Sequence, residues 1–519
     1  MIVSSNGFAN GFEGDRDSSL VSLKNGKLQY RMYANEGESE AIHTIPDFSY
    51  CGYRGGGVRL PQLPVRQVLT PVPGDNRARI QQAIDAVSSL PADNDGFRGA
   101  VLLKAGTYTV DGPLFLRTGG VVLRGEGQGP TGTVLIDTLR EQHDFIQVGV
   151  LKKKKPWKPL KETRQPITSP VVPTGARRFA VTSTEGLKRG DRIIVQRTPD
   201  EAWITALDMA QYGWKADIYK VGYERVITDI AENTLLIDAP LVQAIVHRYG
   251  GGMIFKYTVE RISEVGVEHL RLESVYGSET DEEHGWQAIS MNCVENGWVS
   301  GVTARHFGFA AVGLNTSVQQ VTVQDCAYLE GKSKIRGGRR YSFFIDSTSS
   351  RNLFQRCYAS SGRHDFVTGS KVPGPNAFVD SFAEQAHNDT GPHHRYATGI
   401  LFDNVSAPLM RVWNRKAMGS GHGWAGAQVL FWNCHAEQEM CVDSPPGARN
   451  WAIGCTVGKR SGAGYWERMG QKVSPRSLYY QQLQERLGAA ALDNVMLPQQ
   501  KRGSIWELLQ VWAGNGLLS

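Results

Sequence analysis

The feature that most constrains this fold is a short phrase that recurs through the second half of the chain. Each copy is a run of β-forming residues that ends in a small or polar residue. The copies end at Cys326, Cys357, Ser381, Asn404, Cys434 and Cys455. They follow one another at intervals of about 21 to 31 residues, a period typical of a stacked β-solenoid. We therefore expect equivalent positions of successive coils to form columns, so that residues far apart in sequence become neighbours.

One helix and several short strands are predicted ahead of these repeats. Asp75 is a suitable N-cap, and the apolar residues Ile80, Ala83, Ile84 and Val87 recur at helical spacing. Strand-like runs separated by turn residues follow, at 100–108, 114–116 and 120–125. A helix in this place would cover the open end of the solenoid, where an exposed sheet edge would otherwise pair with other chains.

Three segments of this region resemble a known group of proteins. They read Asp-Asn-Arg-Ala-Arg-Ile-Gln-Gln-Ala-Ile from 75, Gly-Ala-Val-Leu-Leu-Lys-Ala-Gly-Thr-Tyr from 99, and Val-Leu-Arg-Gly-Glu-Gly from 122. Residues 70–140 resemble the opening of the pectate-lyase-like superfamily. The resemblance implies a right-handed, single-stranded parallel β-helix. The superfamily holds polysaccharide lyases, glycoside hydrolases, epimerases and phage tailspikes, so the resemblance implies carbohydrate chemistry without naming the reaction.

The whole chain is predicted to be all-β, a parallel β-helix with a small inserted β-subdomain and terminal helices. Short strand-like runs such as 191–195 and 234–238 indicate antiparallel strands in the insert. Ser474 followed by Pro475 predicts the start of a C-terminal helix, and a second helix is predicted near 505–512. The predicted segments are an irregular arm (1–60), the cap helix and first coils (61–150), the insert (151–258), the main coils (259–465) and a helical end (466–519).

Charge and cysteine usage narrow the class of partner. The chain has 57 Lys and Arg against 51 Asp and Glu, a net charge of +6, which favours a polyanion without identifying one. No nucleic-acid recognition motif is present, so an acidic polysaccharide is the expected partner. The basic run 152–155 is read as a solvated loop or a polyanion contact. Four of the seven cysteines lie in the repeated phrase and are predicted to be buried, reduced thiols.

The sequence also indicates whether the protein enters a membrane and where in the cell it is expected. No run approaches the ~20 apolar residues of a membrane-spanning helix, so no membrane insertion is expected. Met1 is not followed by a signal-peptide pattern, which indicates either a cytoplasmic protein or the mature form of an exported one. Because polymeric substrates do not readily enter cells, a secreted or periplasmic location is expected. The oligomeric state is left open.

Basic, imidazole and phenolic residues gather just after the repeated phrase. Coils stack about 4.8 Å apart, so these residues are predicted to share one wall. A wall of like charges repels itself unless an anion binds there. The predicted catalytic residues are Tyr341, Arg363, His364, His387, His394, Arg395 and Tyr396. The predicted substrate-binding residues are His306, Lys332, Arg336, Glu384, Asp389, Arg415 and His422.

Such a wall suits β-elimination in a polysaccharide that contains uronic acid. The reaction removes a proton next to a carboxylate, whose charge must be neutralised, for which Arg363 or Arg395 is suited. A histidine acts as the base, in the order of preference His364, His394 and His387. A tyrosine, Tyr341 or Tyr396, protonates the leaving oxygen, while Lys332 and Arg415 grip neighbouring sugars.

Three alternatives remain open at this point. Hydrolysis or transglycosylation needs two carboxyl groups across the scissile bond, and four acids could supply them: Asp346, Asp365, Glu384 and Asp389. A divalent metal could be held by His387 and Asp389 together with the His393–His394 pair, and calcium is the metal that the resemblance implies. The third alternative is a solenoid that binds glycans without catalysis.

Overall fold

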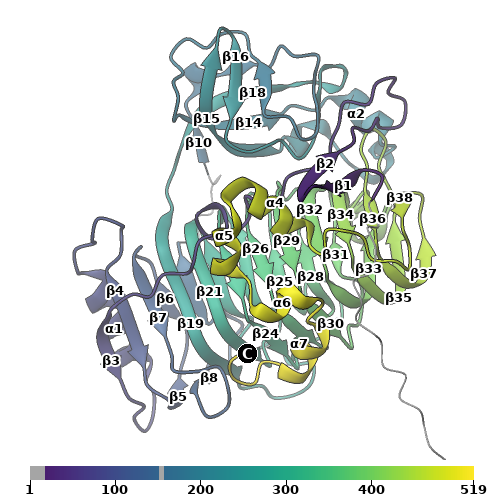
Figure 1. Ribbon diagram of the computed structural model, residues 1–519. Coiled ribbons are helices and arrows are strands. Elements are labelled where there is room, and N and C mark those ends of the chain that lie inside the picture. Colours follow the sequence, from purple (N-terminus) through teal and green to yellow (C-terminus); the bar gives the residue numbers. More distant parts are fainter. Residues whose placement is uncertain (1–17, 151–156, 519) are drawn as a thin grey trace, which may run out of the picture.

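The computed structural model describes residues 18–150 and 157–518, and its centre is a parallel β-helix with three faces (Figure 1). The first face contains β3 (Val65–Leu69), β4 (Gly99–Leu103), β7 (Val121–Arg124), β23 (Thr322–Gln324), β26 (Leu353–Gln355), β29 (Asn376–Val379), β32 (Ala397–Asp403), β34 (Gly426–Trp432), β36 (Trp451–Ile453) and β38 (Tyr465–Glu467). The second face contains β5 (Gly106–Val110), β8 (Thr133–Asp137), β24 (Ala327–Leu329), β27 (Tyr358–Ser360), β30 (Phe382–Glu384), β33 (Ser406–Val412), β35 (His435–Val442) and β37 (Thr456–Ser461).

Two long strands bend across both of these faces, and a third face closes the coil. The long strands are β19 (Ile262–Ser274) and β21 (Val294–Arg305), whose two halves pair with different neighbours. The third face contains β6 (Leu114–Leu116), β9 (Ile146–Gly149), β20 (Gln287–Asn292), β22 (Ala310–Thr316), β25 (Tyr341–Ile345), β28 (His364–Thr368) and β31 (Gly391–Pro392). The predicted parallel β-helix is confirmed by this pairing.

The repeated phrase marks the bend between the first and second faces. At this bend one residue of each coil has a positive φ, a left-handed conformation that Asn, Asp and Gly tolerate best. The residues are His269, Gly301, Asp325, Arg356, Asp380, Asn404, Asn433 and Gly454, with φ between 46° and 70°. The residue after the bend turns inward, which explains why small residues follow. All seven cysteines are buried, and the four of the phrase are reduced thiols, as predicted.

Columns of like residues fill the interior. Phe354, Phe378, Phe402 and Phe431 stack from coil to coil with ring centroids 5.1 Å apart at each step. At the N-terminal end, α1 (Arg77–Ser88) contributes the predicted apolar residues to this core and covers the first coils. Asn76 rather than Asp75 occupies the N-cap position, although the Asp75 carboxylate accepts a hydrogen bond from the Arg77 amide at 2.9 Å.

The C-terminal helices pack along the side of the β-helix rather than over its far end (Figure 1). These helices are α4 (Leu478–Leu487), α5 (Ala489–Val495), α6 (Pro498–Arg502) and α7 (Trp506–Trp512). The N-terminal hairpin of β1 (Val21–Lys24) and β2 (Lys27–Tyr30) packs beside α4. Leu483 of α4 belongs to an apolar cluster with Trp432 and Trp451, and Trp512 of α7 packs with Tyr358.

The start of α4 corrects the prediction from Ser474 and Pro475. The helix begins three residues later, and Ser477 is its N-cap because its hydroxyl accepts a hydrogen bond from the Tyr480 amide at 3.2 Å. The same hydroxyl donates to Asp403 at 2.7 Å, which ties the helix to β32.

We expect the Ser477→Ala variant to lose about 1–2 kcal/mol of unfolding free energy, because one cap and one buried hydrogen bond disappear together. Ser474→Ala is the matched control and should change stability by less than about 0.5 kcal/mol. Urea denaturation of both variants measures the difference. Equal losses in the two variants would contradict this assignment of the cap.

The predicted insert is confirmed as a mainly antiparallel β-subdomain that lies above the middle coils (Figure 1). Its strands are β10 (Trp157–Pro159), β11 (Gln165–Pro166), β12 (Val171–Val172), β13 (Arg178–Ala180), β14 (Arg192–Arg197), β15 (Gly222–Ala231), β16 (Thr234–Ile237), β17 (Ile245–Val246) and β18 (Gly252–Val259). Its own apolar core includes Ile193, Tyr223 and Ile254. The basic run 152–155 lies outside the described residues.

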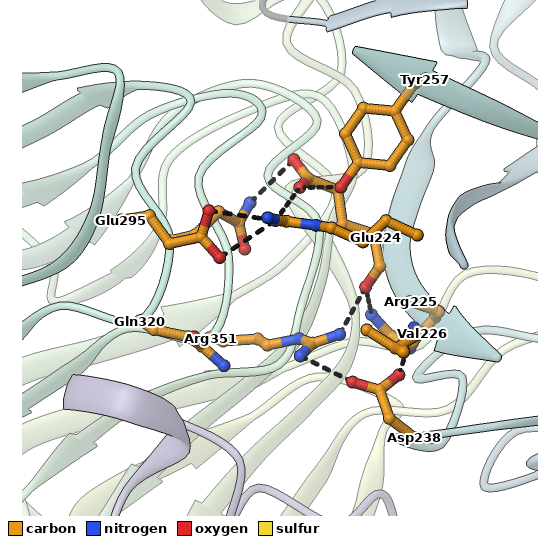
Figure 2. A pocket seen from close by; sticks show the side chains of 10 residues that line it. Glu224, Arg225, Val226, Asp238, Tyr257, Glu295, Gln320 and Arg351 are labelled. Atoms are coloured by element: carbon orange, nitrogen blue, oxygen red, sulfur yellow. Dashed lines mark hydrogen bonds and ion pairs between the residues drawn. The ribbon is translucent and has the colours of Figure 1, made fainter. Parts of the chain in front are cut away.

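A charged seam holds the insert on the β-helix and lines a cavity of about 220 Å³ (Figure 2). Arg351 of the β-helix pairs with Asp238 at 2.9 Å, and its guanidinium also donates to the Glu224 carbonyl. The Glu224 carboxylate accepts hydrogen bonds from Tyr257 at 2.6 Å and from Arg261 at 2.8 Å. Since these charges already neutralise one another across the seam, we interpret the cavity as part of the attachment of the insert.

Candidate functional site

A group of aromatic and imidazole rings gathers at the C-terminal end of the third face. Tyr341 begins β25, His364 begins β28, and His393 and His394 follow β31. His393 is central, because its ring centroid lies 4.5 Å from His364, 5.4 Å from Tyr341 and 5.2 Å from each of His394 and His422. We call these five residues the imidazole cluster.

Strand register explains half of this arrangement. Tyr341 and His364 are direct partners in the parallel pairing of β25 with β28, and their ring centroids are 5.1 Å apart. The chain leaves the sheet after the two residues of β31, and the His393 amide still donates to the Thr368 carbonyl at 3.0 Å. The cluster therefore forms where the third face ends.

The insert explains the other half. His422 lies in a loop closed by the bridge between Asn414 and Trp424. The Trp214 indole of the insert donates to the Gly421 carbonyl at 2.9 Å, and the Trp424 indole donates to the Leu207 carbonyl at 3.1 Å. The segment that contains α2 (Glu201–Ala206) thus holds the His422 loop against the β-helix.

Cations outnumber carboxylates in the cluster. Asp389 accepts a hydrogen bond from His364 Nδ1 through its backbone carbonyl at 2.6 Å, and its carboxylate lies 3.3 Å from the same nitrogen. The carboxylate also pairs with Arg415 at 3.4 Å. Arg363, Arg395 and Arg415 all act electrostatically on these histidines, lowering their pKa values. An additional anion would therefore be stabilised here.

Several buried polar atoms of the cluster and of the two arginines beside it have no hydrogen-bond partner among the described residues. Such atoms normally carry a partner, because an unpaired buried donor or acceptor costs about 1–3 kcal/mol. They are Arg363 Nη1, His364 Nε2, His393 Nδ1, His394 Nδ1, Arg415 Nε and His422 Nδ1. Their concentration in one place indicates a site built to bind a polar group.

Burial keeps these imidazoles neutral. Desolvation lowers the pKa of His364 to about 4, against the attraction of Asp389. Desolvation and the neighbouring cations lower the pKa of His394 to about 3 and that of His422 to about 4, and the pKa of His393 is lowered as well. Burial raises the pKa of Tyr341, although Arg363 opposes this shift. At neutral pH the histidines can accept a proton, and Tyr341 keeps one to donate.

Burial and hydrogen bonding distinguish the candidate bases. His364 is only 1% exposed, and its Nδ1 is engaged by Asp389, so this ring is the less available of the two neighbouring imidazoles. His393 is 6% exposed, while His394 is half-buried. His393 was absent from the predicted catalytic residues. The sequence feature that could have identified His393 is its adjacency to His394. The chain leaves the sheet at these residues, so both side chains can lie beside the same site.

Several predicted residues lie away from the cluster. Tyr396 is 2% exposed and packs edge-on against Trp203 of the insert at 5.0 Å, away from the imidazole cluster. Glu384 lies on the second face beneath α7, where it accepts a hydrogen bond from Gln510 at 2.8 Å. His387 is exposed on the turn between β30 and β31. Arg395 remains beside the cluster and donates to Ser420 at 2.7 Å.

The predicted sugar-gripping residues His306 and Lys332 form a separate group. Lys332 pairs with Glu279 at 3.0 Å and lies over the Tyr276 ring. The His306 ring contacts the same tyrosine, with centroids 4.8 Å apart. Arg336 is exposed on the loop before β25. Of the predicted binding residues, His422 belongs to the cluster, and Asp389 and Arg415 lie beside it.

The acids expected for hydrolysis are engaged in separate contacts. Asp365 is fully buried and accepts a hydrogen bond from Ser342 at 2.7 Å, and burial raises its pKa to about 7. Asp389 is engaged by His364 and Arg415, and Asp346 lies at the opposite end of β25 from Tyr341. Within residues 18–150 and 157–518, no group of three or more His, Cys, Asp or Glu is arranged to hold a metal ion.

Comparisons with known proteins add little beyond the fold. No family model and no curated protein matches this chain. Among solved structures, a protein of Geobacillus virus E2 is 12% identical over 86% of this chain, with a TM-score of 0.35, and this chain spans 65% of its length. A tailspike protein of E. coli bacteriophage HK620 is 12% identical over 75% of this chain and 55% of its own, with a TM-score of 0.40. A polygalacturonase from Erwinia carotovora ssp. carotovora is 10% identical over 79% of this chain and 96% of its own, with a TM-score of 0.36.

These similarities are too distant to carry an argument about the reaction. The strand pairing described above identifies the fold, and the chemistry of the cluster must identify the function. No helix in the described part of the chain is long and apolar enough to cross a membrane.

Proposed function

We propose that this protein is a carbohydrate-active enzyme that cleaves a uronate-containing polysaccharide by β-elimination at the imidazole cluster. The observation that carries the proposal is the contact of Tyr341 with His364 and His393, beside Arg363 and Arg415, in a site with Asp389 as its nearest carboxylate. The stacked coils offer an extended wall for a linear polymer, and the excess of cations suits an acidic one.

Each step of the elimination has a candidate group. Arg415 and Arg363 neutralise the substrate carboxylate and stabilise the enolate-like intermediate. Neutral His393 takes the proton from the carbon next to that carboxylate. The electron pair left on carbon forms the C=C bond as the adjacent C–O bond breaks. The departing oxygen takes its proton from the Tyr341 hydroxyl, and solvent then returns a proton to tyrosine as His393 releases its own.

The bound substrate would also adjust the base. In the free protein the pKa of His393 is lowered by desolvation and by the neighbouring His364 and Arg415. A carboxylate placed among these groups offsets the positive charges and raises the pKa of His393 toward neutrality, where a general base works best. His364, fixed by Asp389, keeps the His393 ring in place. Because polymeric substrates do not readily enter cells, we also propose that the protein is exported.

A panel of acidic and neutral polysaccharides tests the proposal. We expect the ultraviolet absorbance of an unsaturated sugar to rise with at least one uronate polymer. Tyr341→Phe should lower this rate by at least about 100-fold, because the variant lacks only the donating hydroxyl. Tyr276→Phe removes a hydroxyl outside the cluster and should retain the rate. New reducing ends without unsaturation would indicate hydrolysis and overturn the proposal.

A further inference from the structure

A second set of rings continues from the cluster toward the N-terminal coils. Trp286 precedes β20, Phe309 precedes β22, and Tyr341 begins β25, so these residues lie at the starts of three successive strands of the third face. Phe309 lies 6.1 Å from Trp286, 5.1 Å from Tyr341 and 5.3 Å from Phe344, measured between ring centroids. We call these four residues the aromatic platform.

The platform lies on the outside of the β-helix. Phe344 and Tyr341 belong to a small apolar cluster separate from the interior, and Trp286 and Phe309 remain half-buried at its edge. A side chain at Gly308 would meet the Trp286 ring, since a Cβ there would lie 2.6 Å from two of its carbons. Glycine at this position lets the indole rest directly against the backbone.

The platform meets the imidazole cluster at Tyr341, whose ring contacts both Phe309 and His393. Strands repeat about every 4.8 Å along the axis, close to the length of one sugar residue in an extended chain. A sugar bound beside Tyr341 would present its C–H face to the rings, as sugars do on aromatic surfaces. Contiguous rings that are partly open to solvent, as Trp286 and Phe309 are, and lie next to a polar site are typical of a ligand-binding surface.

We infer that the aromatic platform is a sugar subsite that binds the leaving part of the polysaccharide. This inference rests on the proposed function, because Tyr341 is the group that protonates the departing oxygen. The sugar that carries this oxygen must therefore lie on the Tyr341 side of the uronate. That side is the platform.

The charge of the platform narrows the class of polymer. Arg339 lies 6.0 Å from the Trp286 ring centroid, but its guanidinium is paired with Glu282 at 2.8 Å. The rings of the platform carry no charge, whereas the arginines beside the imidazole cluster outnumber the carboxylates there. The platform consequently favours an uncharged sugar next to the uronate. The substrate class is an alternating copolymer of uronate and uncharged sugar rather than a continuous polyuronate.

The test compares Trp286→Ala with Trp466→Ala, a matched loss of a half-buried indole on β38 at the far end of the β-helix. Product absorbance gives KM and kcat on alternating copolymers and on polyuronates. Retardation in gels that contain each polymer gives binding without turnover. We expect Trp286→Ala to raise KM and weaken retardation about tenfold on the alternating copolymer, with kcat little changed. Trp286→Phe should restore most of the affinity, and Trp466→Ala should behave as wild type.

The outcomes separate the two proposals. If wild type forms no product on any polymer, yet Trp286→Ala alone loses retardation, the subsite stands and the lyase proposal fails. If wild type forms product and Trp286→Ala matches Trp466→Ala in KM and retardation, the subsite is overturned and the reaction stands. A wild-type preference for polyuronates over alternating copolymers, or no retention by any polymer, also overturns the subsite.

Discussion

Replacing Arg415 with glutamine should lower product formation by about 10³-fold while the protein stays folded. Arg415 is 7% exposed and pairs with Asp389, so its guanidinium is fixed close to the rings that would hold a substrate. Desolvation lowers the pKa of this arginine, which shows how costly its charge is in the free protein. A substrate carboxylate would offset that cost, and the benefit grows as negative charge spreads through the intermediate.

The size of the effect follows from where the charge acts. In a partly desolvated site a single donor to a developing oxyanion typically contributes 10²–10³ in rate, and a full positive charge lies at the upper end. Because the same charge also binds the ground-state carboxylate, KM should rise as kcat falls. Arg415→Lys keeps a point charge without the planar fork and should recover part of the rate.

The matched control is Arg411→Gln. Arg411 lies on β33, pairs with Glu439 outside the cluster and is half-buried. The Arg411→Gln variant should retain wild-type turnover if the loss in Arg415→Gln depends on the location of Arg415 beside the imidazole rings. Thermal unfolding of both variants separates a loss of turnover from a loss of fold. A similar decrease in kcat for both arginine variants would mean that general surface charge, rather than Arg415, supports the reaction.

The repeated phrase made the fold predictable because it reports a backbone requirement. A left-handed residue at each bend restricts the sequence to Asn, Asp, Gly and a few exceptions such as Arg356, whose guanidinium is held by Asp325 at 2.6 Å. A buried residue follows, and it is Cys or Ser in five of the eight coils. The backbone requirement recurs in each of these coils, so the pattern is visible in the sequence without knowledge of distant contacts.

The roles within the site were less predictable, since burial there depends on the insert. His364, His394 and Arg415 follow the coil pattern and were expected to share a wall. The burial of Tyr396 depends on Trp203, almost 200 residues earlier, and the placement of His422 depends on Trp214. No local pattern records these contacts. The sequence therefore indicated which residue types gather but could not rank His364 against His393.

We expect protonation of His364 to cost the wild-type protein about 3 kcal/mol of stability between pH 6.5 and pH 4. The pKa of this histidine is about 4 in the folded protein, because burial disfavours the charged ring, and its ordinary value is 6.5. Above pH 6.5 the ring is neutral in both states and contributes no pH dependence. As the pH falls toward 4 the unfolded chain takes up a proton that the folded protein refuses, so acid favours unfolding.

Three other histidines of the cluster have lowered pKa values and add to the same slope. His364→Asn isolates the contribution of one ring, since an asparagine amide can still donate to the Asp389 carbonyl, as Nδ1 does. The variant will be less stable at pH 7, because part of a buried ring is missing. That cost is the same at every pH, whereas the protonation effect is not. The curve of unfolding free energy against pH should therefore be flatter for the variant.

Urea denaturation at intervals between pH 4 and pH 8, at constant ionic strength, measures both curves. His387→Asn is the control, because His387 is exposed; its pKa is lowered only by partial burial and by the charge of Arg340, so its curve should lie closer to that of wild type than the curve of His364→Asn. If His364→Asn and wild type lose the same stability between pH 7 and pH 4, the ring is protonated as readily in the folded protein as in the unfolded chain. The cluster would then admit water or an acid freely, and a neutral His393 poised to accept a proton could not be maintained by burial.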